Sequence, residues 1–373
     1  QGQFVGTMDQ NNATGVGPFT MTEMSFTGAF PLANDSDVNF FNPGGTDSFV
    51  FNGTANDDNI QVGPGEAGGT EFRNTLNSIV VSRVEVFNVA NTVVRALAGN
   101  DNINVNVPAG PAGVTLRIEG GDSDASTDTL NYTSISNAAT TINLLAGTIA
   151  STSANPVAFT GIEQVNETSS GASSTITIQG SAGPQAFVYS PTSTTGVGTL
   201  SGFGPRVSFT GVRSLVTFNG ADPASSDKVI VNGIAGQLDN LRYLPTKAGA
   251  GTVVNDNSGQ PNLLFTGVAN VTLAVQQADD DGVRIDGTTG NDAIEFFHGL
   301  TSDSGMFVGT MDQNNATGFG PFTMAPMNYT GAFPLANDSD VNFFNPGGTD
   351  SFVFNGTPND DKIQIAGGEA GGT

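Results

Sequence analysis

The amino-acid sequence predicts an all-β fold. Three observations carry that prediction: short runs of alternating apolar and polar residues, frequent turn residues, and an internal repeat. The chain has 373 residues, of which 50 are Gly and none is Cys or Trp. No stretch keeps the 3.6-residue apolar period of an amphipathic helix over about ten residues. We therefore expect short strands joined by turns and no long helix.

Six segments alternate apolar and polar residues with the period of two that half-buried strands require. They are Ser48–Phe51, Asn59–Val62, Ile103–Val107, Val114–Ile118, Thr175–Ile178 and Lys228–Val231. Turn-forming residues separate such segments. Examples are Pro43-Gly44-Gly45, Asn52-Gly53, Pro64-Gly65, Gly120-Gly121, Asn219-Gly220 and Asn232-Gly233.

A long internal repeat sets the organisation of the chain. Residues 4–70 recur at 307–373 with a constant offset of 303 and no gap, and the copies differ at ten positions: 16, 22, 23, 25, 26, 55, 59, 62, 63 and 64. We expect residues 1–303 to form one full tandem period and residues 304–373, the near-copy of 1–70, to start the next. A solenoid needs caps at its ends, and neither end of this sequence has one. The repeat therefore predicts a longer tandem array, or a subunit whose ends join its neighbours.

A weaker period lies inside the long one. An aromatic-Thr-Gly signature occurs five times, and Ser82–Val86 fits the same slot without the Phe and Gly. This predicts about five degenerate β modules of roughly 50–60 residues in each period. The five occurrences are Phe26-Thr27-Gly28, Phe159-Thr160-Gly161, Phe209-Thr210-Gly211, Phe265-Thr266-Gly267 and Tyr329-Thr330-Gly331.

Two architectures fit this pattern, a parallel β-helix (β-solenoid) and a string of tandem β-sandwich domains. The irregular module length favours the β-helix, because a solenoid accommodates insertions by looping them out of its coils. Dense Asn and Gly at the turns, with Phe and Ile recurring at inward slots, favour it too. A sandwich array remains the alternative, because the 303-residue period is long enough to hold three such domains.

Composition excludes several classes of function. The net charge is −24, from 35 acidic and 11 basic residues, which excludes a reader of the nucleic-acid backbone. With no Cys and a single His, His298, the chain has no disulfide, thiolate or His-rich metal chemistry. No apolar run approaches the length of a membrane span, so we expect no membrane insertion. Few Lys with abundant Gly, Asn, Thr and Ser are typical of an extracellular bacterial surface protein.

The most specific local motif is Gly-Thr-x-x-Asn/Asp-Asp-x-Ile. It occurs at Gly53–Ile60 and Gly356–Ile363, with a close variant at Gly287–Ile294 and a shorter one at Gly99–Ile103. Here the chain resembles the calcium-binding repeats of RTX proteins, whose Gly/Asp turns bind calcium between coils of a β-roll. The nonapeptide of that family never repeats back to back in this chain. The resemblance therefore implies isolated calcium sites and no continuous calcium ladder.

The chain as a whole resembles the very long, tandemly repeated, Cys-free surface proteins of the planctomycete kind. Gly161-Ile162-Glu163-Gln164-Val165 and Val84-Glu85-Val86 carry this second resemblance, together with the Gly-x-Asp-x-Ile turns. It implies an extracellular or cell-surface location and a structural role.

Acidic turns supply the candidate metal ligands, since calcium takes six to eight oxygen ligands. Asp122, Asp124 and Asp128 have the alternate spacing of an EF-hand loop, but Thr127 and Thr133 stand where that loop has Gly and Glu, so we exclude an EF-hand. The alternative to calcium is an acidic turn whose Asp and Asn side chains bond their own backbone. The candidate ligands are Asp57, Asp58, Asp101, Asp122, Asp124, Asp128, Asp279, Asp280, Asp281, Asp286, Asn291, Asp292, Asp360 and Asp361.

No set of catalytic residues stands out, and we expect no enzyme. The predicted function is that of a structural subunit of an extracellular fibre or surface layer, assembled by end-to-end stacking or continuation of solenoid repeats and stabilised by divalent cations. Two alternatives remain, a repeat-stalk adhesin and a polysaccharide-processing β-helix enzyme that uses Arg284. Glycans are a further predicted partner, attached at Asn-x-Ser/Thr sequons. The alternative is that these sequons occur by chance in a chain rich in Asn, Ser and Thr. The sequons lie at Asn12, Asn34, Asn52, Asn131, Asn166, Asn270, Asn315, Asn328, Asn337 and Asn355.

Overall fold

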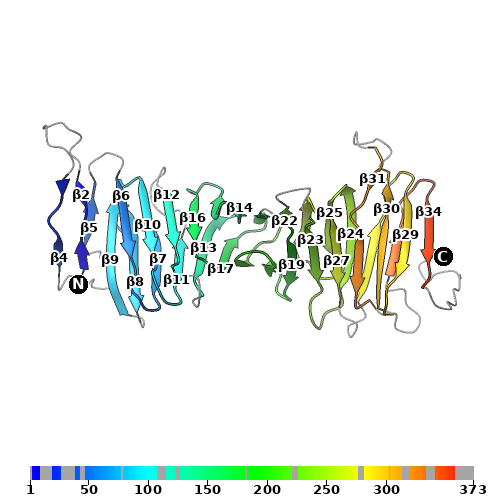
Figure 1. The fold of residues 1–373 in the computed structure, drawn as a ribbon, viewed down its shortest axis with the longest axis horizontal. Coiled ribbons are helices and arrows are strands. Elements are labelled where there is room, and N and C mark those ends of the chain that lie inside the picture. The colour runs from blue at the N-terminus through cyan, green and yellow to red at the C-terminus, as the bar shows by residue number, and fades with distance from the viewer. Residues whose placement is uncertain are drawn as a thin grey trace. The chain divides into compact units, whose positions relative to one another are not determined.

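A computed structural model describes residues 2–8, 19–26, 38–42, 47–76, 79–106, 115–121, 127–181, 183–220, 226–275, 281–301, 303–312, 320–332 and 341–357. Within these ranges every regular element is a β-strand, which confirms the all-β prediction (Figure 1). The chain divides into two compact units: unit 1 holds residues 1–135 and 147–168, and unit 2 holds residues 136–146 and 169–373. The repeat boundary at residue 303 thus lies inside unit 2.

Unit 1 contains two large sheets and two small hairpins (Figure 1, blue to green). The β6 sheet has the order β6 (Ser48–Asn52), β10 (Asn91–Arg95), β12 (Thr115–Glu119), β16 (Val157–Thr160), β15 (Thr148–Ser151). The β7 sheet has the order β5 (Asn39–Phe41), β9 (Ile79–Phe87), β8 (Thr70–Leu76), β7 (Asn59–Pro64), β11 (Asn102–Asn106), β13 (Thr129–Ser136), β17 (Gln164–Ser170). The hairpins pair β1 (Gly2–Phe4) with β4 (Met24–Phe26) and β2 (Thr7–Met8) with β3 (Phe19–Thr20).

The chain in unit 1 passes alternately through the two large sheets. When it returns to a sheet, the new strand pairs in parallel with an earlier strand of that sheet. Strands β6, β10 and β12 run parallel in register, and so do β7, β11 and β13. Alternate residues of these strands are buried, for example Ile60, Ile103 and Leu130, which are opposite one another and have no exposed surface. Register is fixed here because a slip by one residue would turn every inward aliphatic side chain to solvent.

Unit 2 is built from the same kinds of pairing (Figure 1, green to red). The β18 sheet has the order β14 (Ala139–Asn143), β18 (Thr175–Gln179), β22 (Leu215–Asn219), β26 (Asn262–Thr266), β25 (Ala250–Asn255), β24 (Asn240–Lys247), β28 (Gly282–Asp286), β33 (Val341–Phe344). The β23 sheet has the order β21 (Arg206–Thr210), β20 (Val197–Ser201), β19 (Ala186–Pro191), β23 (Lys228–Asn232), β27 (Asn270–Ala274), β32 (Met327–Thr330), β30 (Ser304–Met311), β29 (Ala293–His298), β34 (Ser351–Asn355), and β31 (Phe322–Thr323) pairs with β30.

All six predicted strand segments form strands, as β6, β7, β11, β12, β18 and β23. Val107 and Val114, at the ends of two of the segments, lie outside the described residues. Pro43-Gly44-Gly45, one of the predicted turns, also lies outside them.

The aromatic-Thr-Gly signature marks the end of an antiparallel excursion. Strands β16, β21, β26 and β32 each close such an excursion, pairing antiparallel with β15, β20, β25 and β30. In each the aromatic ring is buried, and the Gly that follows the Thr has a left-handed φ between 62° and 87°. That conformation favours Gly and turns the chain away from the strand it has just completed. The four Gly residues are Gly161, Gly211, Gly267 and Gly331.

The module without Phe and Gly has a different register from the one the sequence suggests. When Ser82–Val86 is aligned with the aromatic-Thr-Gly signature, Arg83 takes the position of the Gly. In the structure Arg83 lies inside β9 and not at a turn. The left-handed residue is Asn88, with φ 57°, and Val89 after it is buried like the residue that follows each of the four glycines. Asn tolerates this conformation better than other residues with side chains, so it replaces Gly here.

The two copies of the repeat fold the same way locally. Strands β1 and β4 pair Phe4 with Met24, and strands β30 and β32 pair the equivalent residues Phe307 and Met327. Their surroundings differ. In unit 2 this hairpin lies between β27 and β29, and Met327 is fully buried, whereas Met24 is half exposed.

Candidate functional site

Every buried aspartate among the described residues directly precedes a strand. We call these the corner aspartates. Their carboxylates are at most 2% exposed, although a buried charge is costly unless it is hydrogen-bonded. Each corner aspartate lies where the chain turns from one sheet to the other. This position explains why its carboxylate is buried and why main-chain N–H groups are close enough to bond it. They are Asp58, Asp101, Asp128, Asp227, Asp239, Asp281 and Asp292.

In unit 1 the corner aspartates form a ladder along the turn. The backbone N–H of Asp58 donates to Oδ1 of Asp101 (2.7 Å), and that of Asp101 donates to Oδ1 of Asp128 (2.9 Å). The N–H of Asp128 donates in turn to Glu163 (2.7 Å). Each carboxylate therefore satisfies a main-chain donor that a turn would otherwise leave unpaired.

The residue before each corner aspartate makes a second ladder that runs the other way. The N–H of Asn100 donates to Oδ1 of Asp57 (2.8 Å), and the N–H of Thr127 donates to Oδ1 of Asn100 (2.8 Å). Two neighbouring side chains thus tie each turn to its neighbours in both directions.

Unit 2 repeats the arrangement. Asp239 N–H donates to Asp281 (2.7 Å), and Asp292 N–H donates to Asp350 (2.7 Å). The outer ladder also recurs, because the N–H of Thr349 donates to Oδ1 of Asn291 (2.8 Å). The ladder is therefore a general feature of the described turns and belongs to no single site.

The Gly-Thr motif of the sequence forms the turn that ends at a corner aspartate. At Gly287–Asp292, the N–H and hydroxyl of Thr288 both donate to the Asp292 carboxylate, at 2.6 and 2.8 Å. The equivalent bonds join Thr54 to Asp58. A Cβ on Gly287 would lie 2.7 Å from Oδ2 of Asp292, so only Gly leaves room for the carboxylate.

Burial changes the acidity of two members of the ladder. Burial raises the pKa of Asp101 to about 7, opposed by the hydrogen bond from the Asp58 backbone and reinforced by the charges of Asp128, Asp58 and Asp57. Burial also raises the pKa of Asp128, and the charge of Glu163 adds to the effect. Oδ2 of Asp101 is buried and has no hydrogen-bond partner among the described residues. Burial of this unpaired oxygen is consistent with the raised pKa of Asp101.

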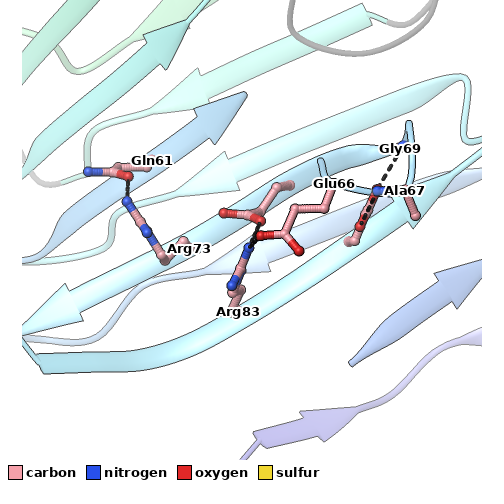
Figure 2. A network of polar contacts seen from close by, with 8 residues as sticks. Gln61, Glu66, Ala67, Gly69, Arg73 and Arg83 are labelled. Carbon is pink, nitrogen blue, oxygen red and sulfur yellow. Dashed lines mark hydrogen bonds and ion pairs between the residues drawn. The ribbon is translucent and has the colours of Figure 1, made fainter. Parts of the chain in front are cut away.

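In the β7–β8–β9 meander (Figure 2), a buried glutamate accepts main-chain N–H groups of a turn, as the corner aspartates do elsewhere. The carboxylate of Glu85, 1% exposed, accepts the N–H groups of Ala67 (3.1 Å) and Gly69 (2.8 Å). Beside it, Arg83 bridges Glu66 (2.9 Å) and Glu71 (2.7 Å). Figure 2 shows Arg83 next to Glu66.

The same network raises the pKa of Arg83. Burial alone would lower the Arg83 pKa, but the hydrogen bonds and charges of the two glutamates outweigh burial and raise it. Arg73 on β8 also donates to Gln61 on β7. These contacts hold the three strands of the meander together.

The structure separates some of the candidate metal ligands and joins others. Asp281 and Asp286 lie at opposite ends of β28, about 16 Å apart at the usual rise per residue. Asp286 faces two arginines instead of other acids. Among the residues that the structure describes, no three His, Asp or Glu side chains converge as a metal ion would need. Calcium at the corner aspartates remains a prediction, and Asp122, Asp124, Asp279, Asp280, Asp360 and Asp361 lie outside the described residues.

Arg284 lies in an open groove of about 520 Å³ on unit 2, walled by Leu244, Pro245 and Phe344. It stands opposite Arg242 in the β24–β28 register, and Asp286 pairs with both guanidinium groups. The Arg284 guanidinium carbon lies 4.2 Å above the Phe344 ring centroid. Two arginines in one groove form an uncommon concentration of positive charge in a chain with 11 basic residues.

Several sequon asparagines have amides that are already engaged. The side-chain N–H₂ of Asn166 donates to Asn131 (2.8 Å), and that of Asn131 donates to Asn104 (3.1 Å). Asn328 donates to Asn270 in the same way (2.8 Å). The Asn131 amide also donates to Asn102, so a glycan on Asn131 would replace a hydrogen that one of these two bonds uses.

Sequence reasoning missed several of these buried or turn carboxylates. They are Glu85 in the meander, and Glu163, Asp227, Asp239 and Asp350 at the turns. The signal that finds the aspartates is an Asp two residues before an inward apolar residue, as in Asp227-Lys228-Val229. A Gly five to eight residues upstream strengthens the signal, because at five such glycines an added Cβ would clash with the aspartate carboxylate. They are Gly53, Gly120, Gly220, Gly233 and Gly287.

Comparison with protein-family models, with characterised proteins and with solved structures finds no match to this chain. The described part of the chain also contains no helix long and apolar enough to cross a membrane.

Proposed function

We propose that each unit is a β-solenoid and that the protein is a structural subunit of an extracellular fibre or surface layer. Alternation between two sheets, with parallel in-register pairing of successive strands, supports the solenoid over the sandwich. A coil is then one passage through both sheets, and the aspartate ladders bond the corner of each coil to the next. A molecule built this way gains length by adding coils, with no change in local chemistry.

One observation carries the proposal: the second copy of the repeat adds to the sheets that precede it. Strands β32, β33 and β34 pair in parallel with β27, β28 and β29. The repeated sequence thus extends existing sheets and forms no separate fold. Extension by a repeated unit is the geometry that a fibre requires.

Electron microscopy of the purified protein, with and without a calcium chelator, tests the proposal. We expect filaments or ordered arrays at high protein concentration, and shorter ones in the chelator if divalent cations bridge the acidic turns. Filaments of the same length with and without the chelator would show that calcium is not needed for assembly. Only dispersed particles in every condition would remove the fibre.

The Arg242–Arg284 groove favours a second candidate function, that of a binding module for anionic polysaccharide. The ion pair of Arg284 with Asp286 uses Nε, so the two Nη groups form the fork that would meet a ligand, and the Phe344 ring packs against the guanidinium. A carboxylate is the natural ligand for such a fork. We expect R284A to abolish retention on a polyuronate column, while R117A, which removes an exposed arginine paired with Glu119 in unit 1, leaves it unchanged. Equal retention of both variants would exclude the groove.

A further inference from the structure

The outward face of four neighbouring strands in unit 1 carries no charge. Strands β7, β11, β13 and β17 follow one another in the β7 sheet (Figure 1). Over residues 59–63, 102–106, 129–133 and 164–168, every second side chain points away from the core and is half-buried or exposed. We call this surface the amide face, and none of its residues is acidic, basic or aromatic. They are Asn59, Gln61, Gly63, Asn102, Asn104, Asn106, Thr129, Asn131, Thr133, Gln164, Asn166 and Thr168.

The side-chain amides of this face form a continuous chain of hydrogen bonds. Asn104 donates to Asn59 (2.8 Å), and Asn131 donates to Asn104 (3.1 Å). Asn166 donates to Asn131 (2.8 Å), and Gln164 donates to Asn166 (2.8 Å). Each bond orients the amide that makes it, and such chains strengthen one another. The amide face is therefore ordered before a partner arrives, and it loses less side-chain entropy on binding than a mobile face would.

Charged side chains lie around the amide face. Glu71 and Arg73 are outward residues of β8, the strand next to β7. The outward side of the β6 sheet carries Arg95, Arg117 and Glu119. Two copies of a chain with a net charge of −24 repel each other. The repulsion between facing surfaces is weakest where both surfaces are uncharged, so the amide face is the part of this unit that a second copy can approach most closely.

The geometry of the amide face also suits a second copy of itself. Strands of a sheet lie about 4.8 Å apart, and outward residues repeat about every 6.6 Å along each strand. Two copies therefore present the same lattice of donors and acceptors, and Asn ladders of this kind pack closely between paired sheets. A neutral glycan is the other candidate, but ligand sites are usually lined by aromatic side chains, and the amide face has none.

We propose that two copies of the protein pair laterally, amide face to amide face. The inference rests on the proposed function and supplies the lateral contact of the fibre or layer. Strands β7, β11 and β13 each already have a strand on both sides, so only their outward face is open to a partner. Both copies use the same surface, so the contact is isologous.

The size of the amide face makes a single pair weak. Four strands of five residues offer roughly 300 Å². A stable complex buries about 800 Å² on each partner. Association therefore depends on many such contacts acting together along a fibre or layer.

A charge-swap experiment tests the pairing. Thr133 is exposed on the amide face, and one variant carries T133E and another T133K. We expect each variant alone to associate about tenfold more weakly than the parent chain, because like charges then meet across the pair. An equal mixture of the two should associate at least as strongly as the parent, because opposite charges meet. Sedimentation velocity at high protein concentration measures this, in about 0.1 M salt, where charges act over about 10 Å.

The matched controls are V50E and V50K, which make the same changes at an exposed outward residue of the β6 sheet. We expect neither control to change association. Equal losses at positions 50 and 133 would overturn the pairing, because net charge alone would then explain them. Hydrogen exchange in β11 and β13 at the parent level establishes that the Thr133 variants are folded.

Two further results would overturn the pairing. One is a parent chain that stays monomeric at every concentration, and the other is folded Thr133 variants whose mixture does not recover association. Filaments that persist unchanged in T133E would exclude the amide face as a fibre contact and leave the fibre proposal intact. Charge-swap recovery in a protein that forms no filaments would keep the pair and remove the fibre.

Discussion

At the scale of the residue, the chemistry of this chain is concentrated in buried carboxylates at turns. An aspartate suits this position because its short side chain reaches main-chain N–H groups one strand away while its own backbone turns. Aspartate also carries a cost, since burial opposes ionisation. Asp101 shows both effects: its Oδ1 accepts the Asp58 N–H, and its Oδ2 is buried with no hydrogen-bond partner in the part of the chain that the structure describes.

Replacing Asp101 separates these effects. The carboxyl has an ordinary pKa of 3.8 and a folded-state pKa of about 7, so the unfolded chain loses this proton first as pH rises. Its contribution to stability is therefore complete below about pH 4 and is lost as pH rises to about 7. We expect D101N, which keeps the acceptor, to reduce the loss of unfolding free energy between about pH 5 and about pH 8 by about 2 kcal/mol. Urea titrations at the two pH values measure this.

The control for that experiment is D101A, which removes the acceptor as well. We expect D101A to be less stable than D101N by about 1–3 kcal/mol at both pH values, because neither variant titrates at this position and in D101A the Asp58 N–H has lost its acceptor. A D101N variant with the same pH dependence as the parent chain would contradict the assignment of the titration to Asp101.

At the scale of the element, the recurring structure is an antiparallel excursion that ends in an aromatic-Thr-Gly turn. The sequence predicts the turn because both the buried ring and the left-handed Gly are chemically specific. It does not predict the role of the corner aspartates, since metal binding and backbone bonding use the same residue types. The distinction depends on which turns are neighbours, and Asp58 and Asp101 are neighbours only after the chain has gone through β7, β8, β9 and β10.

The left-handed glycine is testable at Gly211. Its φ is 82°, and a Cβ there would lie 1.9 Å from the carbonyl oxygen of Ser169. We expect G211A to lower the unfolding free energy by at least about 2 kcal/mol, from the left-handed conformation and the clash together. Chemical denaturation gives the value.

Gly236 supplies the matched control. Its φ is 73°, but no atom lies within 4 Å of the added Cβ. We expect G236A to cost about 1 kcal/mol, the conformational part alone. Equal losses in G211A and G236A would mean that the close approach to Ser169 contributes nothing.

At the scale of the whole molecule, parallel pairing makes stability local. Each strand contacts the strands before and after it in its sheet, so a packing defect should weaken its neighbours most. Phe265 in β26 is fully buried and stacks on Tyr243 of β24 at 5.8 Å. We expect F265A to lower the local unfolding free energy by about 3–5 kcal/mol. Hydrogen-exchange protection should then fall in β22, β24, β25 and β26. Protection in β7 and β11 of unit 1 should stay unchanged, and its loss there would show all-or-none unfolding instead.

Charge acts on the molecule as a whole. A net charge of −24 repels itself in any compact state, and mobile ions screen that repulsion. The Debye length falls from about 20 Å to about 6 Å between about 20 mM and about 300 mM salt. We expect the melting temperature to rise by several degrees over that range in NaCl, because repulsion is weakened more than the buried hydrogen bonds of the ladders. Calorimetry in CaCl₂ and MgCl₂ at matched ionic strength then isolates specific binding. A larger rise in CaCl₂ than in MgCl₂ would indicate calcium sites, equal rises would mean that screening accounts for the whole effect, and a fall with NaCl would contradict the repulsion argument.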